Sequence, residues 1–116
     1  MQQYMLLIYG EESVWANMTP DQLSQEMGAY MAYTQDLQKA GVYIAGHELQ
    51  PVETAKTVSI TGGKQKVVDG PFAETKEALG GYYFINAESQ DEALAWAAKC
   101  PGARHGRIEV RPVVMR

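Results

Sequence analysis

Two titratable side chains of this sequence, Asp69 and His105, could do chemistry together. Asp69 opens the motif Asp69-Gly70-Pro71-Phe72, which interrupts an apolar segment, and His105 comes just before the last apolar segment of the chain. A carboxylate and an imidazole that meet in a cleft can exchange protons with a bound substrate. We therefore take Asp69 and His105 as the candidate catalytic residues.

The same motif also has a purely structural interpretation. Aspartate accepts backbone N–H groups in tight turns, glycine adopts left-handed angles, and proline fixes the direction in which the chain leaves. Phe72 would then anchor a corner between two strands. We expect the motif to build that corner and the corner to aim Asp69 toward the cleft.

A second group of residues is suited to holding a ligand. The segment 107–114 alternates between charged and apolar side chains, so one face of a strand there would carry Arg107, Glu109 and Arg111. The aromatic segment 81–86 places a ring on that face in either register, and Tyr83 is our candidate. Arginine beside tyrosine suits a small anionic or aromatic molecule. These four residues are the candidate ligand-binding set.

Other reactive side chains give weaker signals. His47 and His105 stand far apart with no HxH or HxxxH pattern, so we predict neither a metal site nor a bound cofactor. Cys100 ends an apolar segment, which is typical of a buried and inert thiol. Glu74 and Glu77 are expected to be solvated, the alternative being an ion pair with an arginine, Arg104 or Arg111.

The totals describe one globular domain, residues 1–116, with 46% hydrophobic and 21% charged residues. The net charge of −4 and the lack of any basic run argue against a nucleic-acid partner. No apolar run is long enough to cross a bilayer, so no membrane partner is expected. The single cysteine fits a reducing compartment, and we expect a cytoplasmic protein.

The elements that must position these residues follow from periodicity and from cap and turn signals. We predict strands at 4–9, 42–49, 81–86 and 107–114, a hairpin of 56–60 and 64–68, and helices starting after Thr19 and Ser89. The first helix should bury one stripe of side chains, which consists of Leu23, Met27, Tyr30, Met31, Thr34 and Leu37. Without the hairpin the order is the α+β, ferredoxin-like βαββαβ pattern, which leaves one sheet face uncovered.

Four stretches of the chain resemble a known family: YMLLIYG, LQP, VDGPFAETKEALGGYYFI and IEVRPV. Together they resemble the YCII-related superfamily, in the branch named for its Asp-Gly-Pro-Phe motif. The resemblance implies a homodimer that pairs the open sheet faces into a dimeric α+β barrel. Some relatives use a histidine on the first helix and an aspartate after the second. Those positions hold Tyr30 or Met31 and Cys100 here, so this dyad is not transferred.

Two functions remain open from the sequence. One is a small-molecule-binding protein with a cleft at the dimer or sheet face, in a regulatory setting, because the resembling branch is associated with genes for alternative sigma factors. The other is a lyase or hydrolase that uses Asp69 and His105 for acid–base chemistry in that cleft.

Overall fold

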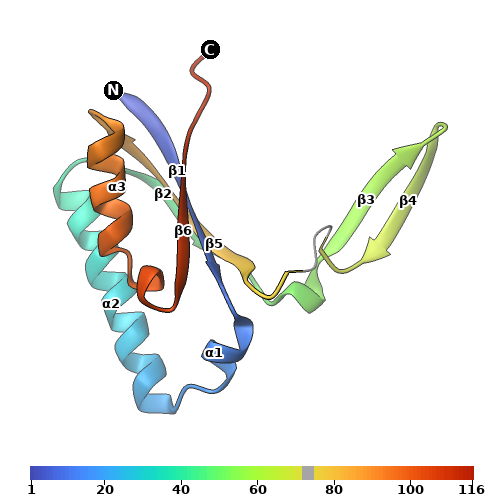
Figure 1. Ribbon diagram of the computed structural model, residues 1–116, viewed down its shortest axis with the longest axis horizontal. Coiled ribbons are helices and arrows are strands. Elements are labelled where there is room, and N and C mark those ends of the chain that lie inside the picture. Colours follow the sequence, from blue (N-terminus) through green and yellow to red (C-terminus); the bar gives the residue numbers. More distant parts are fainter. Residues whose placement is uncertain (72–74) are drawn as a thin grey trace.

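The structure is a computed structural model that describes residues 1–71 and 75–116. Its body is a four-stranded antiparallel sheet in the order β2-β5-β1-β6, made of β1 (Gln2–Gly10), β2 (Tyr43–Glu48), β5 (Ala78–Ala87) and β6 (Gly106–Pro112). Helices α2 (Pro20–Lys39) and α3 (Gln90–Lys99) lie on one side of this sheet (Figure 1). This order confirms the predicted ferredoxin-like fold. In the described part of the chain, no helix has the length and apolar character needed to cross a membrane.

Local capping interactions explain where both helices begin. The Thr19 hydroxyl accepts the N–H of Gln22, and the Gln22 side chain accepts the N–H of Thr19, which completes the predicted capping box of α2. The Ser89 hydroxyl likewise accepts the N–H of Glu92 at the start of α3. The Glu92 carboxylate, however, accepts the N–H of Glu88, one residue before the cap, so the second capping box is only half formed.

The strand register decides which side chains face the helices. Tyr4 and Leu6 of β1 are buried on the helix side, opposite Ile85 and Tyr83 of β5. On β6, two apolar side chains, Ile108 and Val110, pack against this core. The charged side chains of β6 that alternate with them therefore lie on the open face, as the alternation predicted.

The buried stripe of α2 differs from the predicted one. Leu37 is buried as expected, but Met27 and Met31 are exposed, and the buried positions are instead Glu26 and Tyr33. The prediction was wrong here because the apolar residues of α2 lie on two neighbouring faces of the helix. One face meets the sheet, and the other, with Leu23 and Met27, lines a cavity described below.

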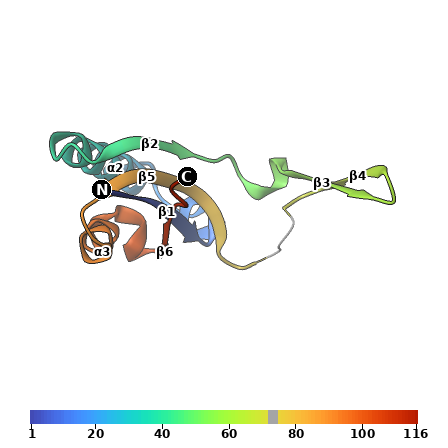
Figure 2. The same cartoon turned by 90° about the horizontal axis from the view of Figure 1, so that it is seen from above.

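The hairpin formed by β3 (Lys56–Thr61) and β4 (Lys64–Asp69) was predicted correctly. Gly62 and Gly63 both have positive φ angles, 59° and 79°, as a tight two-residue hairpin turn requires. The hairpin extends away from the body on the side of the sheet opposite to the helices (Figures 1 and 2). A short helix η1 (Val52–Thr54) lies at its root.

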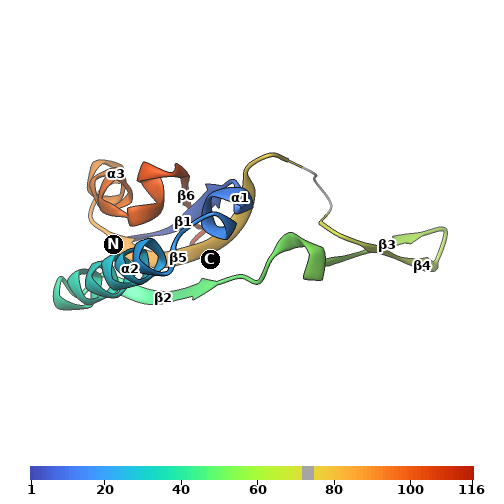
Figure 3. The ribbon, with the colours of Figure 1, turned by 90° about the horizontal axis from the view of Figure 1, so that it is seen from below.

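The short helix α1 (Glu12–Ala16) between β1 and α2 was not predicted, and neither were the two 3-10 helices. Its N-cap residue, Glu11, makes no side-chain cap hydrogen bond, so the sequence has no start signal there. Figure 3 shows α1 beside the sheet and near the start of α2. Its Trp15 ring lies 6.2 Å from the ring of Tyr30 (centroid to centroid), which fixes α1 against α2.

Candidate functional site

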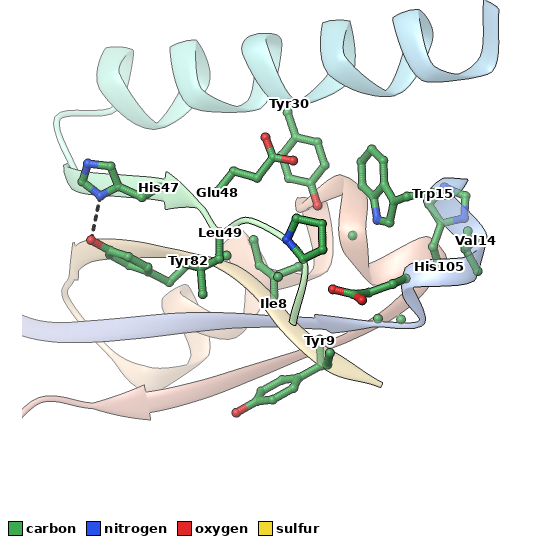
Figure 4. A pocket seen from close by; sticks show the side chains of 18 of the residues that line it. Ile8, Tyr9, Val14, Trp15, Tyr30, His47, Glu48, Leu49, Tyr82 and His105 are labelled. Atoms are coloured by element: carbon green, nitrogen blue, oxygen red, sulfur yellow. Dashed lines mark hydrogen bonds between the residues drawn. The ribbon is translucent and has the colours of Figure 1, made fainter. Parts of the chain in front are cut away.

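The main cavity of the described chain has a volume of about 980 Å³. It is bounded by α1, the first half of α2, one end of the sheet and the segment that leads into the hairpin. Aromatic and aliphatic side chains form most of its wall, among them Leu23 and Met27. Figure 4 shows three others, Ile8, Trp15 and Tyr30. A cavity of this size and lining suits a small, largely apolar molecule.

A buried carboxylate holds the imidazole at one end of this cavity. Glu26 of α2 is only 6% exposed, and its Oε2 lies 2.9 Å from Nε2 of His105, which lines the cavity. The Arg104 guanidinium donates to the other oxygen, Oε1, at 3.2 Å. Because a buried polar group is unfavourable unless it is paired, these two partners offset the burial of the Glu26 carboxyl group.

The bend after α3 is what brings Arg104 and His105 to Glu26. The 3-10 helix η2 (Pro101–Arg104) follows Cys100 directly and turns the chain back toward β6. Gly102 lies at the tightest point, because a Cβ there would come within 2.6 Å of the Tyr30 hydroxyl and 2.8 Å of Ile8 Cγ2. A side chain at this position would push η2, and with it His105, away from α2.

Two tyrosines and one thiol near the cavity are held in their neutral forms. Burial raises the pKa of Tyr30 and of Tyr83, and the Tyr83 hydroxyl is bonded to Thr34 Oγ1 at 2.8 Å. Burial also raises the pKa of the Cys100 thiol. A protonated, buried thiol is a poor nucleophile, so the chemistry of this site does not start from Cys100.

The other end of the cavity carries a second histidine. His47 Nδ1 lies 2.7 Å from the Tyr82 hydroxyl, and both residues line the cavity (Figure 4). The pair is exposed, unlike the buried Glu26 that holds His105. Among the residues described, no cluster of three or more histidine, cysteine, aspartate or glutamate side chains is arranged to hold a metal ion.

The structure separates the residues that the sequence suggested as one site. Tyr83 and His105 both line the cavity. Arg107, Glu109 and Arg111 lie on the other face of the sheet, where Arg107 approaches Glu77 at 3.6 Å and Arg111 pairs with Glu109. The aromatic rings on that open face belong to Tyr82 and Phe84, because Tyr83 points toward the helices.

Asp69 lies at the end of β4, outside the cavity lining of a single chain. Its side chain is 85% exposed and pairs with Lys56 Nζ at 2.5 Å. Within one chain the carboxylate therefore closes the root of the hairpin and does not point into the cavity. The expected roles of Phe72 and Glu74 lie outside the described residues.

Sequence reasoning missed Glu26, which is the central residue of this site. A signal was present, because Glu26 falls on the same helix face as Tyr30, Tyr33 and Leu37 at intervals of three and four residues. A carboxylate on a buried helix face needs a partner, and this need is what could have identified it.

Comparison with known proteins supports one family assignment. The model of the YCII-related domain matches residues 2–115. An uncharacterised protein of Rhizobium meliloti (strain 1021) is 36% identical over 114 residues, which are 97% of this chain and 92% of that protein. A solved structure, 5-chloro-2-hydroxyhydroquinone dehydrochlorinase from Burkholderia phenoliruptrix AC1100 in complex with 2,5-dihydroxybenzoquinone, has a TM-score of 0.53 at 15% identity. It covers 98% of this chain and 93% of its own, and it shares the fold. The chain thus belongs to the YCII-related domain family.

Proposed function

We propose that this protein is a small-molecule enzyme of the lyase or hydrolase kind, in which His105 transfers a proton and Glu26 positions the His105 side chain. The single observation that carries the proposal is the 2.9 Å contact between the buried Glu26 carboxylate and the His105 imidazole at the wall of an apolar cavity. A buried acidic group that orients a histidine is the arrangement on which general base catalysis depends.

The chemistry follows from the two ring nitrogens. An ionised Glu26 accepts a hydrogen bond from Nε2–H, which fixes the tautomer and leaves the lone pair on Nδ1. Nδ1 can then take a proton from a substrate carbon or from a water molecule. The carboxylate stabilises the imidazolium that forms, and Arg104 donates a hydrogen bond to the other carboxylate oxygen.

The ligand we propose is a neutral aromatic compound. Trp15, Tyr30 and Tyr83 supply ring faces and edges, and the charged side chains that line the cavity are acidic: Glu11, Glu12, Glu48 and Glu53. Among the described lining residues there is no lysine or arginine. This charge pattern favours the aromatic half of the sequence expectation over the anionic half. The dehydrochlorinase that shares the fold acts, by its name, on a hydroquinone.

A non-catalytic binding module is the second candidate. It would use the same cavity for a regulatory ligand, and the sigma-factor association of the resembling branch is the reason to retain it. A cytoplasmic homodimer is part of both proposals, supported by the single cysteine and by the uncovered sheet face. The two candidates differ in one measurable property, the transfer of a proton to or from a bound ligand.

Deuterium exchange tests that difference. A panel of phenols and hydroquinones is first screened by thermal shift, because a ligand that binds only the folded state raises the melting temperature. Each hit is then incubated with the protein in D2O, and exchange of its ring C–H positions is followed by NMR. The enzyme proposal predicts exchange that His105→Ala slows by about a hundredfold or more, within the range usual for a general base.

A matched variant separates positioning from chemistry. Glu26→Gln keeps the side-chain size but removes the charge, so we expect the exchange rate to fall while ligand binding persists. Arg107→Ala, on the other face of the sheet and outside the cavity lining, should leave the rate within about threefold. Saturable binding with neither C–H exchange nor hydrolysis of the ligand would favour the binding module instead.

A further inference from the structure

The hairpin β3–β4 is an unusual feature for a small α+β domain. Two strands of six residues each extend from the body without a third strand beside them. An isolated two-stranded hairpin is marginal in water, and it needs packing against another surface to persist. The described chain provides no sheet or helix that covers it (Figures 1 and 2).

The two faces of the hairpin differ in character. Val58 and Val67 lie opposite each other in the register, and Ile60 lies two residues along on the same face. These three side chains are 59%, 50% and 72% exposed. Gln65 also lies on this face, opposite Ile60, whereas the other face carries Thr57, Ser59, Thr61, Lys64 and Lys66 with a single apolar side chain, Val68. An apolar stripe of this kind on an exposed hairpin is typical of a surface that becomes covered on association.

A second apolar surface of the chain also lacks a cover. On the open face of the four-stranded sheet, Met5 lies opposite Phe84 and Leu7 opposite Tyr82, and these side chains are only half-buried. The hairpin extends on this same side of the sheet (Figure 2). It therefore flanks the space that a molecule packed on the open face would occupy.

We propose that the β3–β4 hairpin is an arm that grips a second copy of this chain, with Val58, Ile60 and Val67 packing on the open sheet face of that copy. In a two-fold symmetric pair each arm would reach across the partner and cover the part of its open sheet face that the two sheets do not bury against each other. The arm therefore adds a second contact to a dimer in which the open sheet faces pack against each other.

The charges of the chain favour a second copy as the occupant. Residues 56–69 contain Lys56, Lys64 and Lys66 against one acid, Asp69, which gives a net charge of +2. Since the whole chain carries −4, the remainder carries −6. The arm of one copy is thus attracted to the body of another as a whole, which favours the encounter of two copies, while the apolar contacts and not the charges direct the arm to the open face, where Arg107 and Arg111 lie.

The available areas agree with a joint interface. A six-residue hairpin covers about 200 Å² per face, given a rise of about 3.3 Å per residue and strands about 4.8 Å apart. The same spacings give the four-stranded sheet about 400 Å². A stable interface buries about 800 Å² per partner. Neither surface reaches this value alone, but arm and sheet together approach it.

Sedimentation of matched variants tests the arm. The wild-type protein is expected to dimerise at about micromolar concentration. Ile60→Asp places a charge in the apolar stripe and should raise the dimer Kd by about tenfold or more, whereas Ser59→Asp, one residue away on the polar face, should change it by less than about threefold. The circular dichroism spectra of the variants should match that of the wild type because β3 lies outside the core.

A third variant locates the docking surface. Leu7→Asp on the open sheet face should weaken the dimer as Ile60→Asp does, while Leu94→Asp on the outer face of α3 serves as its control. A monomeric wild-type protein, or an unchanged Kd in Ile60→Asp, overturns the arm. A dimer that Ile60→Asp weakens and Leu7→Asp leaves intact overturns the sheet face as its docking surface.

Discussion

The charge cluster of Glu26, Arg104 and His105 allows a prediction about stability that depends on which member is removed. Glu26 is buried, whereas the side chains of Arg104 and His105 are 64% and 36% exposed. Removing an exposed partner leaves a buried carboxylate with too few donors. Removing the carboxylate leaves two cationic or polar groups that water can solvate. The cluster should therefore respond asymmetrically.

The expected magnitudes follow from this geometry. Arg104→Ala removes one charged hydrogen bond to Oε1 and should cost about 1–2 kcal/mol, a value below that of a fully buried pair because Arg104 is largely solvated. Arg104→Ala combined with His105→Ala leaves the buried Glu26 carboxylate without either partner and should lower the free energy of unfolding by about 3–5 kcal/mol. Adding Glu26→Gln to that double variant removes the stranded charge and should restore about 2 kcal/mol or more.

Urea unfolding monitored by circular dichroism measures these differences at constant m-value. Arg107→Ala is the matched control, because its ion pair with Glu77 is exposed at 3.6 Å, and it should change stability by less than about 0.5 kcal/mol. A double variant within about 1 kcal/mol of wild type, or no recovery on adding Glu26→Gln, would refute the claim that Glu26 is a buried charge held by these two partners.

Three further predictions test other parts of the site. Asp69→Asn should lower stability by less than about 1 kcal/mol in urea unfolding and leave ligand-induced thermal shifts unchanged; a tenfold loss of ligand affinity would show a working carboxylate. Cys100 should react with iodoacetamide at least about tenfold more slowly in the native protein than in urea, as followed by mass spectrometry, because burial raises the pKa of its thiol; equal rates would contradict this. Burial also raises the pKa of Tyr30, so the stability that the neutral Tyr30 side chain contributes is complete below the ordinary tyrosine pKa of about 10 and is lost as the pH rises above it. The free energy of unfolding should therefore fall above that pH, and it should fall less in Tyr30→Phe. An identical pH profile for the two proteins would contradict this prediction.

The fold was predictable from the sequence because its signals are local. The hairpin required only two short β-favouring runs around Gly62-Gly63, and both glycines adopt the positive φ angles that such a turn needs. The start of α2 required only Thr19, Pro20 and Gln22. The sequence did not predict α1, because its N-cap residue makes no side-chain hydrogen bond and the helix is held by the tertiary contact of Trp15.

The site was less predictable because its residues meet through tertiary structure. Glu26 and His105 are 79 positions apart in the chain, and their contact depends on the η2 bend at Gly102. No local sequence pattern predicts the direction in which that bend turns the chain. Asp69 received too much weight for the opposite reason, since it stands in a long and specific motif, and specificity of sequence does not distinguish a catalytic group from a structural one.

The described part of the Asp-Gly-Pro-Phe motif lies where the proposed arm joins the body. The Gly70 N–H donates to the Ala55 carbonyl at 2.7 Å, the Thr57 hydroxyl donates to the Gly70 carbonyl at 2.8 Å, and Asp69 pairs with Lys56. Gly70 has a φ angle of 99°, which a residue with a side chain adopts only with strain. These bonds close the root of the hairpin, so they set the direction in which the arm leaves.

That root is also close to the cavity along the chain. Pro51 and Val52, which precede β3, line the cavity, and the Val52 N–H donates to Glu12 of α1. Only a few residues therefore separate the arm from this wall of the cavity. If a second copy holds the arm, occupation of the cavity and dimerisation must be linked, because anything that orders the shared segment favours both. On this argument the described part of the motif, Asp69 to Pro71, closes the hairpin root and connects the proposed arm to the proposed binding cavity.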